Sequence, residues 1–233
     1  MSTAVADARR LYRQIADQIV RLILGGDFPV GARLPSERDL AERLEVSRPT
    51  VREALIALEV EGVVEVRVGA GVYVTARPTP GRTPDPRPAP GPFDVIRARW
   101  LVESECAALA AEHANDVQLD RMKTAVMEMR EYTDHTPQGI AADQRFHQCI
   151  AEASGNAALL LLVQQLWEQR TGPLYTRLES HFVGRSIWRQ AVQEHEALLD
   201  AIASREPAAA RSAMQLHMKN AELRFASGWK VHE

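Results

Sequence analysis

Residues 33–74 read RLPSERDLAERLEVSRPTVREALIALEVEGVVEVRVGAGVYV, and their pattern indicates how the first part of the chain folds. It contains two short helical patterns on either side of a turn at Glu45-Val46. Ser36 and Ser47 stand where each helix should begin, and a serine hydroxyl accepts a hydrogen bond from the free N–H groups of a first helical turn. The stretch therefore predicts a helix-turn-helix pair.

The flanking residues complete a recognisable order of elements. Apolar residues from Leu11 to Ile23 recur at helical spacing and predict an earlier helix, which ends at Gly25-Gly26. After the pair, residues 64–68 and 72–74 alternate on either side of Gly69-Ala70-Gly71, as the two strands of a hairpin do. Three helices followed by a glycine-tipped hairpin predict a winged helix-turn-helix, which we assign to residues 1–76.

A proline-rich segment separates this domain from the rest. Residues 76–92 read ARPTPGRTPDPRPAPGP and hold seven prolines. Proline lacks the N–H donor and fixes φ, so residues 77–92 are predicted to be a semi-extended linker. Every later segment has a helical pattern and none alternates like a strand, so residues 93–233 are predicted to be an all-α bundle. Its six expected helices are 93–114, 117–133, 138–153, 156–171, 184–204 and 207–227.

Composition limits the classes of protein that remain. The formal net charge is −3, so a nucleic-acid binder of this composition must gather its positive charge on one face. The two cysteines, Cys106 and Cys149, lack metal-type spacing and fit a reducing compartment. The N-terminus lacks an apolar signal core, and the longest apolar run, near 157–163, is too short to span a membrane. We expect a cytoplasmic protein without a membrane partner.

The start of the second helix of the pair carries the chemistry for reading DNA. This helix normally enters the major groove by its N-terminal residues. Arg48 can pair with O6 and N7 of guanine, and the free N–H groups of the helix start favour phosphate. The residues expected to hold phosphates or bases beside it are Arg38, Ser47, Thr50 and Arg52. Alternatively, the same residues could form an ordinary capped helix start without a role in DNA binding, with Arg52 paired to Glu53 or Glu59.

Histidine and aspartate residues in the second part form a candidate metal site. Asp143 and His147 are four residues apart, so they share one helix face. His195 and His217 lie inside two later helices of the bundle. Three helices aimed at one interior point would give one oxygen and three nitrogen ligands, which suit Zn²⁺, Ni²⁺ or a similar ion. Each residue also has an interpretation without metal. Asp143 and His147 could form a hydrogen-bonded pair on the surface, His195 could be exposed, and His217 could be a hydrogen-bonded histidine of the core.

Residues 10–75 resemble the N-terminal domain of the GntR family of bacterial regulators, and residues 93–227 look like the FCD effector domain of its largest subfamily. The resemblance implies a homodimer on a short palindromic operator. It implies four metal ligands at Asp143, His147, His195 and His217. Pro49 departs from the small polar residue common at that position. The positions implied to contact DNA are Arg38, Ser47, Arg48, Thr50, Arg52 and Gly69.

Within that family, residues 91–99, 101–104 and 166–170 look like those of the regulators of hexuronate utilisation. A sugar acid offers a carboxylate that a guanidinium can hold by two bonds, and Arg99 and Arg170 are the candidates. Alternatively, Arg99 could form an ordinary ion pair with Glu103, four residues later on the same helix.

We therefore expect a repressor, and not an enzyme, that loses operator affinity on binding a galacturonate, glucuronate or fructuronate. One rival is a structural metal with another small carboxylate as effector. The other is a metal-dependent hydrolase with a base such as Glu103.

Overall fold

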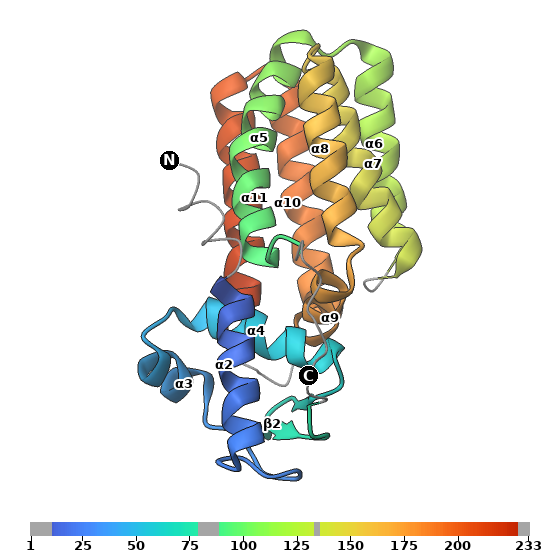
Figure 1. Cartoon of the computed structure of the whole chain (residues 1–233). Coiled ribbons are helices and arrows are strands. Elements are labelled where there is room, and N and C mark those ends of the chain that lie inside the picture. The colour runs from blue at the N-terminus through green and yellow to red at the C-terminus, as the bar shows by residue number, and fades with distance from the viewer. Residues whose placement is uncertain (1–10, 79–88, 133–135, 228–233) are drawn as a thin grey trace, which may run out of the picture. The chain divides into compact units, whose positions relative to one another are not determined.

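The structure is a computed structural model that describes residues 11–78, 89–132 and 136–227 (Figure 1). These residues form ten helices and one two-stranded hairpin, which confirms the mainly α fold with a winged helix-turn-helix. The elements are α2 (Leu11–Gly25), α3 (Glu37–Leu44), α4 (Arg48–Val60), β1 (Val64–Arg67), β2 (Gly71–Val74), α5 (Pro92–His113), α6 (Asp116–Glu131), α7 (Pro137–Ala153), α8 (Ala157–Arg170), α9 (Pro173–Phe182), α10 (Arg185–Ala203) and α11 (Pro207–Ala226).

The described residues divide into two compact units that do not follow chain order. Unit 1 comprises the chain up to Phe93, Thr171–Phe182 and the end from Phe225. Unit 2 comprises Asp94–Arg170 and Val183–Arg224. Most of the predicted linker, residues 79–88, lies outside the described residues. The chain thus passes between the units several times, and α9 belongs with the winged part.

In unit 1 the predicted caps form. Ser36 Oγ accepts a hydrogen bond from the Asp39 amide at 3.2 Å, and Ser47 Oγ accepts one from the Thr50 amide at 3.3 Å. The hairpin pairs antiparallel from Val64 opposite Val74 to its tip. The core gathers side chains from α2, α3, α4 and the hairpin: Ile15, Ile19, Leu40, Leu55, Leu58, Val64 and Val66 are all buried. Burial of this shared face holds the three helices and the wing together.

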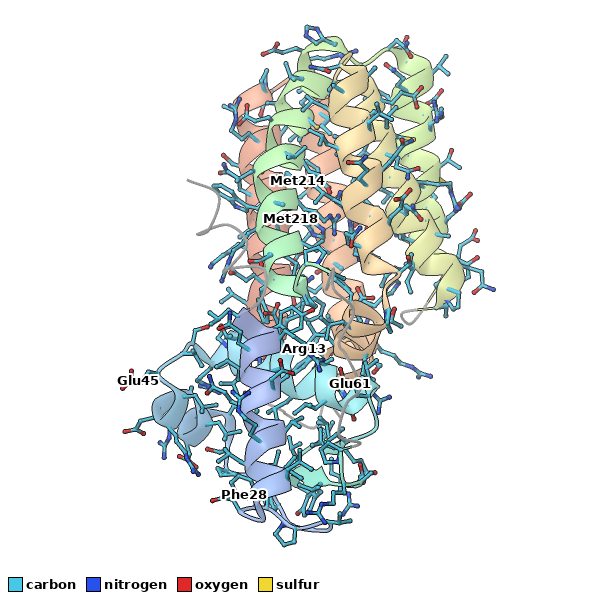
Figure 2. All side chains as sticks on the ribbon, in the orientation of Figure 1. Arg13, Phe28, Glu45, Glu61, Met214 and Met218 are labelled. Atoms are coloured by element: carbon cyan, nitrogen blue, oxygen red, sulfur yellow. The ribbon has the colours of Figure 1, made fainter. Side chains whose placement is uncertain are left out.

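An ion pair also fastens the first helix of unit 1 to α4. Arg13 on α2 bonds Glu61, which directly follows α4, and Figure 2 shows the two side chains pointing toward one another. The partly buried pair restrains the end of α4.

Unit 2 is the predicted helical bundle. Figure 1 shows its long helices side by side, and Figure 2 marks Met214 and Met218 on α11. These methionines are buried in one core with Phe146 on α7 and Trp167 on α8. The six predicted helices match α5, α6, α7, α8, α10 and α11 to within about two residues at each end, as expected for patterns flanked by clear turn signals.

The sequence prediction missed α9. Six helices were expected after the linker, and the described residues contain seven. Gly172-Pro173 marks a turn, but proline is also favoured in the first turn of a helix. The signal for the missing helix is a stripe of Tyr175, Leu178 and Phe182, which are buried. None of the described helices combines the length and apolar character needed to cross a membrane.

Candidate functional site

The first turn of α4 is open to solvent, as is Val60 at the other end of the helix. Ser47 and Arg48 are exposed and Thr50 is half-buried, whereas every residue from 51 to 59 is buried. The Arg48 side chain is 53% exposed, with Nη2 3.9 Å from Glu37. Amide groups of the first turn and an arginine are thus presented together, which is an arrangement that binds phosphate and base edges.

Two further predicted DNA-contacting positions are also exposed. The Arg38 side chain on α3 is 82% exposed. Gly69 lies at the hairpin tip with φ of 77°, a conformation that glycine adopts without strain. The wing adds an arginine that the sequence prediction did not include: Arg67 stacks on Tyr73 at 4.5 Å and its side chain is 53% exposed. The sequence could have indicated Arg67 as a DNA contact, because it lies close to the glycines of the predicted hairpin tip.

Arg52 is placed differently from the other predicted contacts. It is 1% exposed, and its guanidinium bonds both carboxylate oxygens of Glu37 and the carbonyl of Phe225. Its charge also lies 5.1 Å from the centre of the Phe182 ring. Glu37 on α3 is a partner that the sequence alternatives, Glu53 and Glu59, did not include, because a partner on another helix depends on packing. A phosphate contact would require Arg52 to leave Glu37.

The structure brings the four predicted metal ligands together in unit 2. His147 on α7, His195 on α10 and His217 on α11 are buried, and their ligand atoms all lie within 4.8 Å of one another. Asp143 Oδ1, one helical turn before His147, lies 3.2 Å from His147 Nε2 and 3.1 Å from His195 Nε2. Three helices therefore present three imidazoles and one carboxylate to a common point.

Each imidazole is held through its other nitrogen. His147 Nδ1 lies 2.5 Å from Glu103, His195 Nδ1 2.6 Å from the Ala191 carbonyl, and His217 Nδ1 2.8 Å from Glu194. An acceptor at Nδ1 keeps the proton there and leaves the Nε2 lone pair for a metal. The three rings are thus oriented with the same nitrogen toward the common point.

The residues at this point fit a divalent transition-metal ion. The Nε2 atoms of His147 and His195 are 3.1 Å apart, so two lone pairs would face each other without a cation or a proton between them. Asp143 Oδ1 is also buried, and no hydrogen bond of good geometry reaches it from the described residues, although both Nε2 atoms lie within 3.2 Å. A buried polar atom of this kind is costly unless something binds it. Three nitrogen donors and one oxygen donor satisfy Zn²⁺ or Ni²⁺.

The protonation of the histidines agrees with this donor set. Burial, with His195 nearby, lowers the pKa of His217 to about 3, so this ring is neutral and able to bind metal. Burial also acts to lower the pKa of His147, but the Glu103 and Asp143 carboxylates outweigh it and raise that pKa. A bound cation would take the place of the His147 proton in this negative surrounding.

Both predicted effector arginines lie at the metal-ligand set. Arg99 is 3% exposed, and its Nε lies 2.6 Å from Glu103. Arg170 donates from Nη1 to Asp143 Oδ2 at 3.0 Å. Both guanidinium groups stack on Trp167, with ring-centre distances of 4.3 Å for Arg99 and 4.2 Å for Arg170. The open alternative for Arg99, its pairing with Glu103, is present in the structure.

Carboxylates behind the ligands were missed by sequence reasoning. Burial raises the pKa of Glu103, but Arg99 and His147 overcome this and hold it at about 2, so Glu103 stays charged. Glu194 accepts from Asn220 at 2.8 Å and also bonds Arg224. The sequence prediction considered Glu103 as a catalytic base or as the partner of Arg99, but not as the support of His147. It took the glutamates beside His195 as a sign of exposure.

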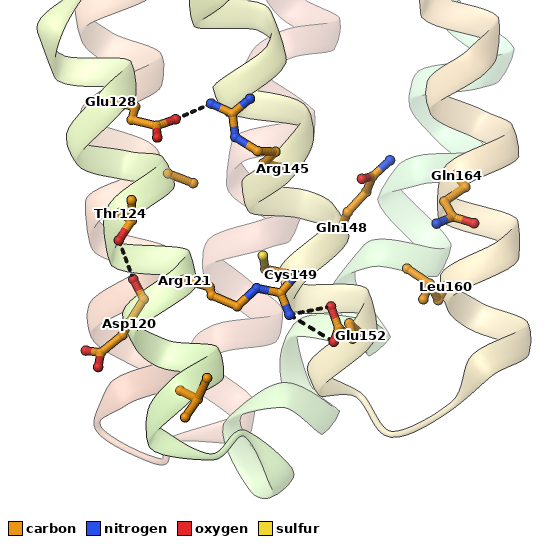
Figure 3. Close-up of a pocket in the computed structure, with 12 residues that line it drawn as sticks. Asp120, Arg121, Thr124, Glu128, Arg145, Gln148, Cys149, Glu152, Leu160 and Gln164 are labelled. Carbon is orange, nitrogen blue, oxygen red and sulfur yellow. Dashed lines mark hydrogen bonds and ion pairs between the residues drawn. The ribbon is translucent and has the colours of Figure 1, made fainter.

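A second cavity of about 560 Å³ lies along α6, α7 and α8 and shares no residue with the metal-ligand set (Figure 3). Four of its five charged lining residues pair with one another: Arg121 bonds Glu152 at 2.9 Å, and Arg145 bonds Glu128. The ion pairs on its wall satisfy these charges, in contrast to the buried, incompletely bonded Asp143.

Comparisons with known proteins match both parts of the chain. Residues 11–74 match the family described as "Bacterial regulatory proteins, gntR family", and residues 94–220 match the FCD domain. The Uxu operon transcriptional regulator of Escherichia coli (strain K12) is 36% identical, over 95% of this chain and 89% of the relative. The Exu regulon transcriptional regulator of the same strain is 34% identical, over 94% and 86%.

A solved structure supports the fold. A GntR family member from Pseudomonas syringae pv. tomato superposes with a TM-score of 0.51 at 24% identity. The match covers 93% of this chain and 85% of that protein.

Proposed function

The chain belongs to the GntR family of bacterial transcription regulators and carries an FCD domain, and from this premise we propose that a sugar acid, a hexuronate, controls its affinity for operator DNA. It is a DNA-binding regulator, as are the relatives that it resembles, and not an enzyme. The regulator is a repressor, and the hexuronate releases it from the operator.

The observation that carries this proposal is the buried ligand set of unit 2. Asp143, His147, His195 and His217 would hold a divalent ion, zinc or nickel. When bound, the ion would offer open coordination positions to oxygen ligands such as a carboxylate and its neighbouring hydroxyl. The residues of the chain then orient the ligand and exclude water.

Arg170 and Arg99 supply the positive charge that a sugar acid requires. Arg170 already bonds a carboxylate, that of Asp143, so an effector carboxylate would compete for its guanidinium. Arg99 is held by Glu103 and stacked on Trp167, so it contributes charge from a fixed place. The two arginines favour an acidic sugar over a neutral one.

On the DNA side, the exposed first turn of α4 reads the operator. We propose that Arg48 contacts bases while Ser47 and Thr50 hold phosphates. Arg38 and Gly69 are exposed on α3 and the wing and join this surface. Arg52 joins only after release from Glu37. Two copies of the chain bind the two halves of a palindrome as a homodimer.

Elemental analysis and a thermal-shift panel test this proposal. The purified protein should contain about one divalent ion per chain. D-galacturonate, D-glucuronate or D-fructuronate should raise its melting temperature, and neutral D-galactose serves as the matched control without a carboxylate. The active acid should also weaken operator binding. A panel that changes neither melting temperature nor DNA affinity refutes the proposed effector.

His195→Ala separates the proposal from its closest rival. Loss of metal together with the sugar-acid response supports a ligand bound at the metal. Loss of metal with an intact response supports a structural metal and a carboxylate bound elsewhere.

A further inference from the structure

Three charged residues of α4 are buried, and each bonds a different segment of unit 1. Arg52 bonds the carbonyl of Phe225, at the end of α11. Glu53 accepts from the Phe93 amide at 2.9 Å, in the first turn of α5. Glu59 bonds α9. The DNA-reading helix is therefore attached to every segment by which unit 1 continues into unit 2.

The attachment through Glu59 is the most complete. Its Oε1 accepts from the Val66 amide of β1 at 3.0 Å and from Arg177 of α9 at 2.9 Å. Its Oε2 lies 2.7 Å from Nε2 of His181, also on α9. The Glu59 side chain is 3% exposed, so its bonds are poorly screened by water. One carboxylate thus joins the reading helix, the wing and α9.

The chain leads from α9 directly back to the proposed sensor site. Arg170, which bonds Asp143 at 3.0 Å, precedes α9 by only Thr171 and Gly172. Three Cα–Cα steps span at most about 11 Å. An effector that draws Arg170 away from Asp143 therefore acts within three residues of the point from which α9 begins.

The end of α11 repeats this arrangement. Phe225, whose carbonyl bonds Arg52, directly follows Arg224. Arg224 bonds Glu194, and Glu194 holds the Nδ1 of His217 at 2.8 Å. Two segments that contact α4 thus begin beside arginines whose partners are a proposed ligand, Asp143, or the support of one.

We propose that Glu59 is a positioning residue that transmits the ligand state of the metal-centred site to the DNA-reading helix, through its bonds to Arg177 and His181 on α9. This inference rests on the proposed function. The Glu59 contact gives α9 a fixed attachment to α4 and to the wing strand, so displacement of α9 acts on both DNA-reading elements through one carboxylate. Without the contact, sensing and DNA reading continue independently.

Variants at His181 test the contact without touching a metal ligand or the DNA-reading turn. His181→Ala removes the contact to Glu59 Oε2, and His181→Gln can restore a donor. Arg189→Ala, which removes an exposed charge from α10, is the matched control. For each full-length protein, affinity is measured for DNA selected by the wild type from a random pool. The protein is metal-loaded, chelator-treated, or metal-loaded with each of the three hexuronates.

The wild type and Arg189→Ala should show a ligand-dependent affinity change of about 5- to 150-fold, the usual range of allosteric coupling. His181→Ala should retain its metal content and its ligand-free DNA affinity within about twofold. Its ratio of DNA affinities without and with ligand should fall below the wild-type ratio, because only the Arg177 contact to Glu59 then remains. His181→Gln should recover most of that ratio. A His181→Ala protein with the wild-type ratio overturns this inference alone. A wild type that responds to no metal or hexuronate overturns both this inference and the proposed function.

Hydrogen–deuterium exchange of the wild type provides a test that does not depend on a variant folding. Adding metal and the active hexuronate should change amide exchange in α9 and in α4 together. A change confined to α7, α10 and α11, with α9 and α4 unaltered, overturns the inference.

Discussion

Glu59→Gln should make the stability of unit 1 less dependent on acid. Burial raises the pKa of Glu59, but hydrogen bonds from His181, Arg177 and the Val66 amide outweigh it and lower the pKa from 4.5 to about 2. Such a change on folding corresponds to about 3 kcal/mol of stability. Because the folded-state pKa is the lower one, this contribution is fully present above pH 4.5 and is lost as the pH falls toward 2.

The expected size follows from linkage. Between pH 7 and pH 3 the wild type should lose about 2 kcal/mol through Glu59 alone. Glutamine cannot titrate, so the free-energy difference between wild type and Glu59→Gln should shrink by that amount over the same range. Other carboxylates titrate in both proteins, and their contribution cancels in the difference.

Amide exchange of residues 51–59 is the suitable assay, measured at pH 7, 5, 4 and 3 after correction for intrinsic rates. Three of the four tryptophans, Trp100, Trp167 and Trp188, lie in unit 2, so tryptophan fluorescence does not report on unit 1 alone. Glu65→Gln, which removes an exposed carboxylate from β1, is the control. A difference between wild type and Glu59→Gln that stays constant across this pH range would refute the reasoning.

Other predictions concern DNA reading, metal binding and packing. Arg48→Ala should weaken operator binding by about 1–3 kcal/mol and relax the preference for one base, measured by fluorescence anisotropy on single-base operator variants; a uniform loss across all variants would show a phosphate contact instead. His217→Ala should abolish the bound metal in elemental analysis while the circular dichroism spectrum stays helical, and a full metal complement would remove His217 from the ligand set. Gly139→Ala should cost about 1–3 kcal/mol in calorimetric unfolding, because the new Cβ would lie 2.8 Å from the Trp188 indole; an unchanged melting temperature would show that the indole moves freely.

Sequence patterns located the features that depend on local spacing. The i,i+4 relation of Asp143 and His147 and the serine caps of α3 and α4 are local, and helix geometry alone relates their residues. The exposed positions of Arg38 and Arg48 also follow from their place on short amphipathic helices. Features of this kind do not depend on tertiary packing, so they can be predicted from the sequence.

Features that depend on packing between distant segments were not predictable. Arg52 pairs with Glu37, fifteen residues away, and His147 is held by Glu103, forty-four residues away. Neither spacing corresponds to a helical or strand repeat. The helix 173–182 was missed because its apolar stripe is short and follows a turn signal. Its burial against the winged part arises only from the three-dimensional arrangement of unit 1.

The burial of α4 beyond its first turn has a consequence for how operator preference can diverge within the family. Substitutions at 51–59 would disturb a packed interior, where changes of volume or charge are costly. Arg48 is exposed and Pro49 and Thr50 are half-buried, and surface substitutions usually change stability by only about 0.5 kcal/mol. If residues 48–50 read the operator as proposed, a lineage can acquire a new DNA target by exchanging these three adjacent residues, while the serine cap and buried residues 51–59 preserve the fold.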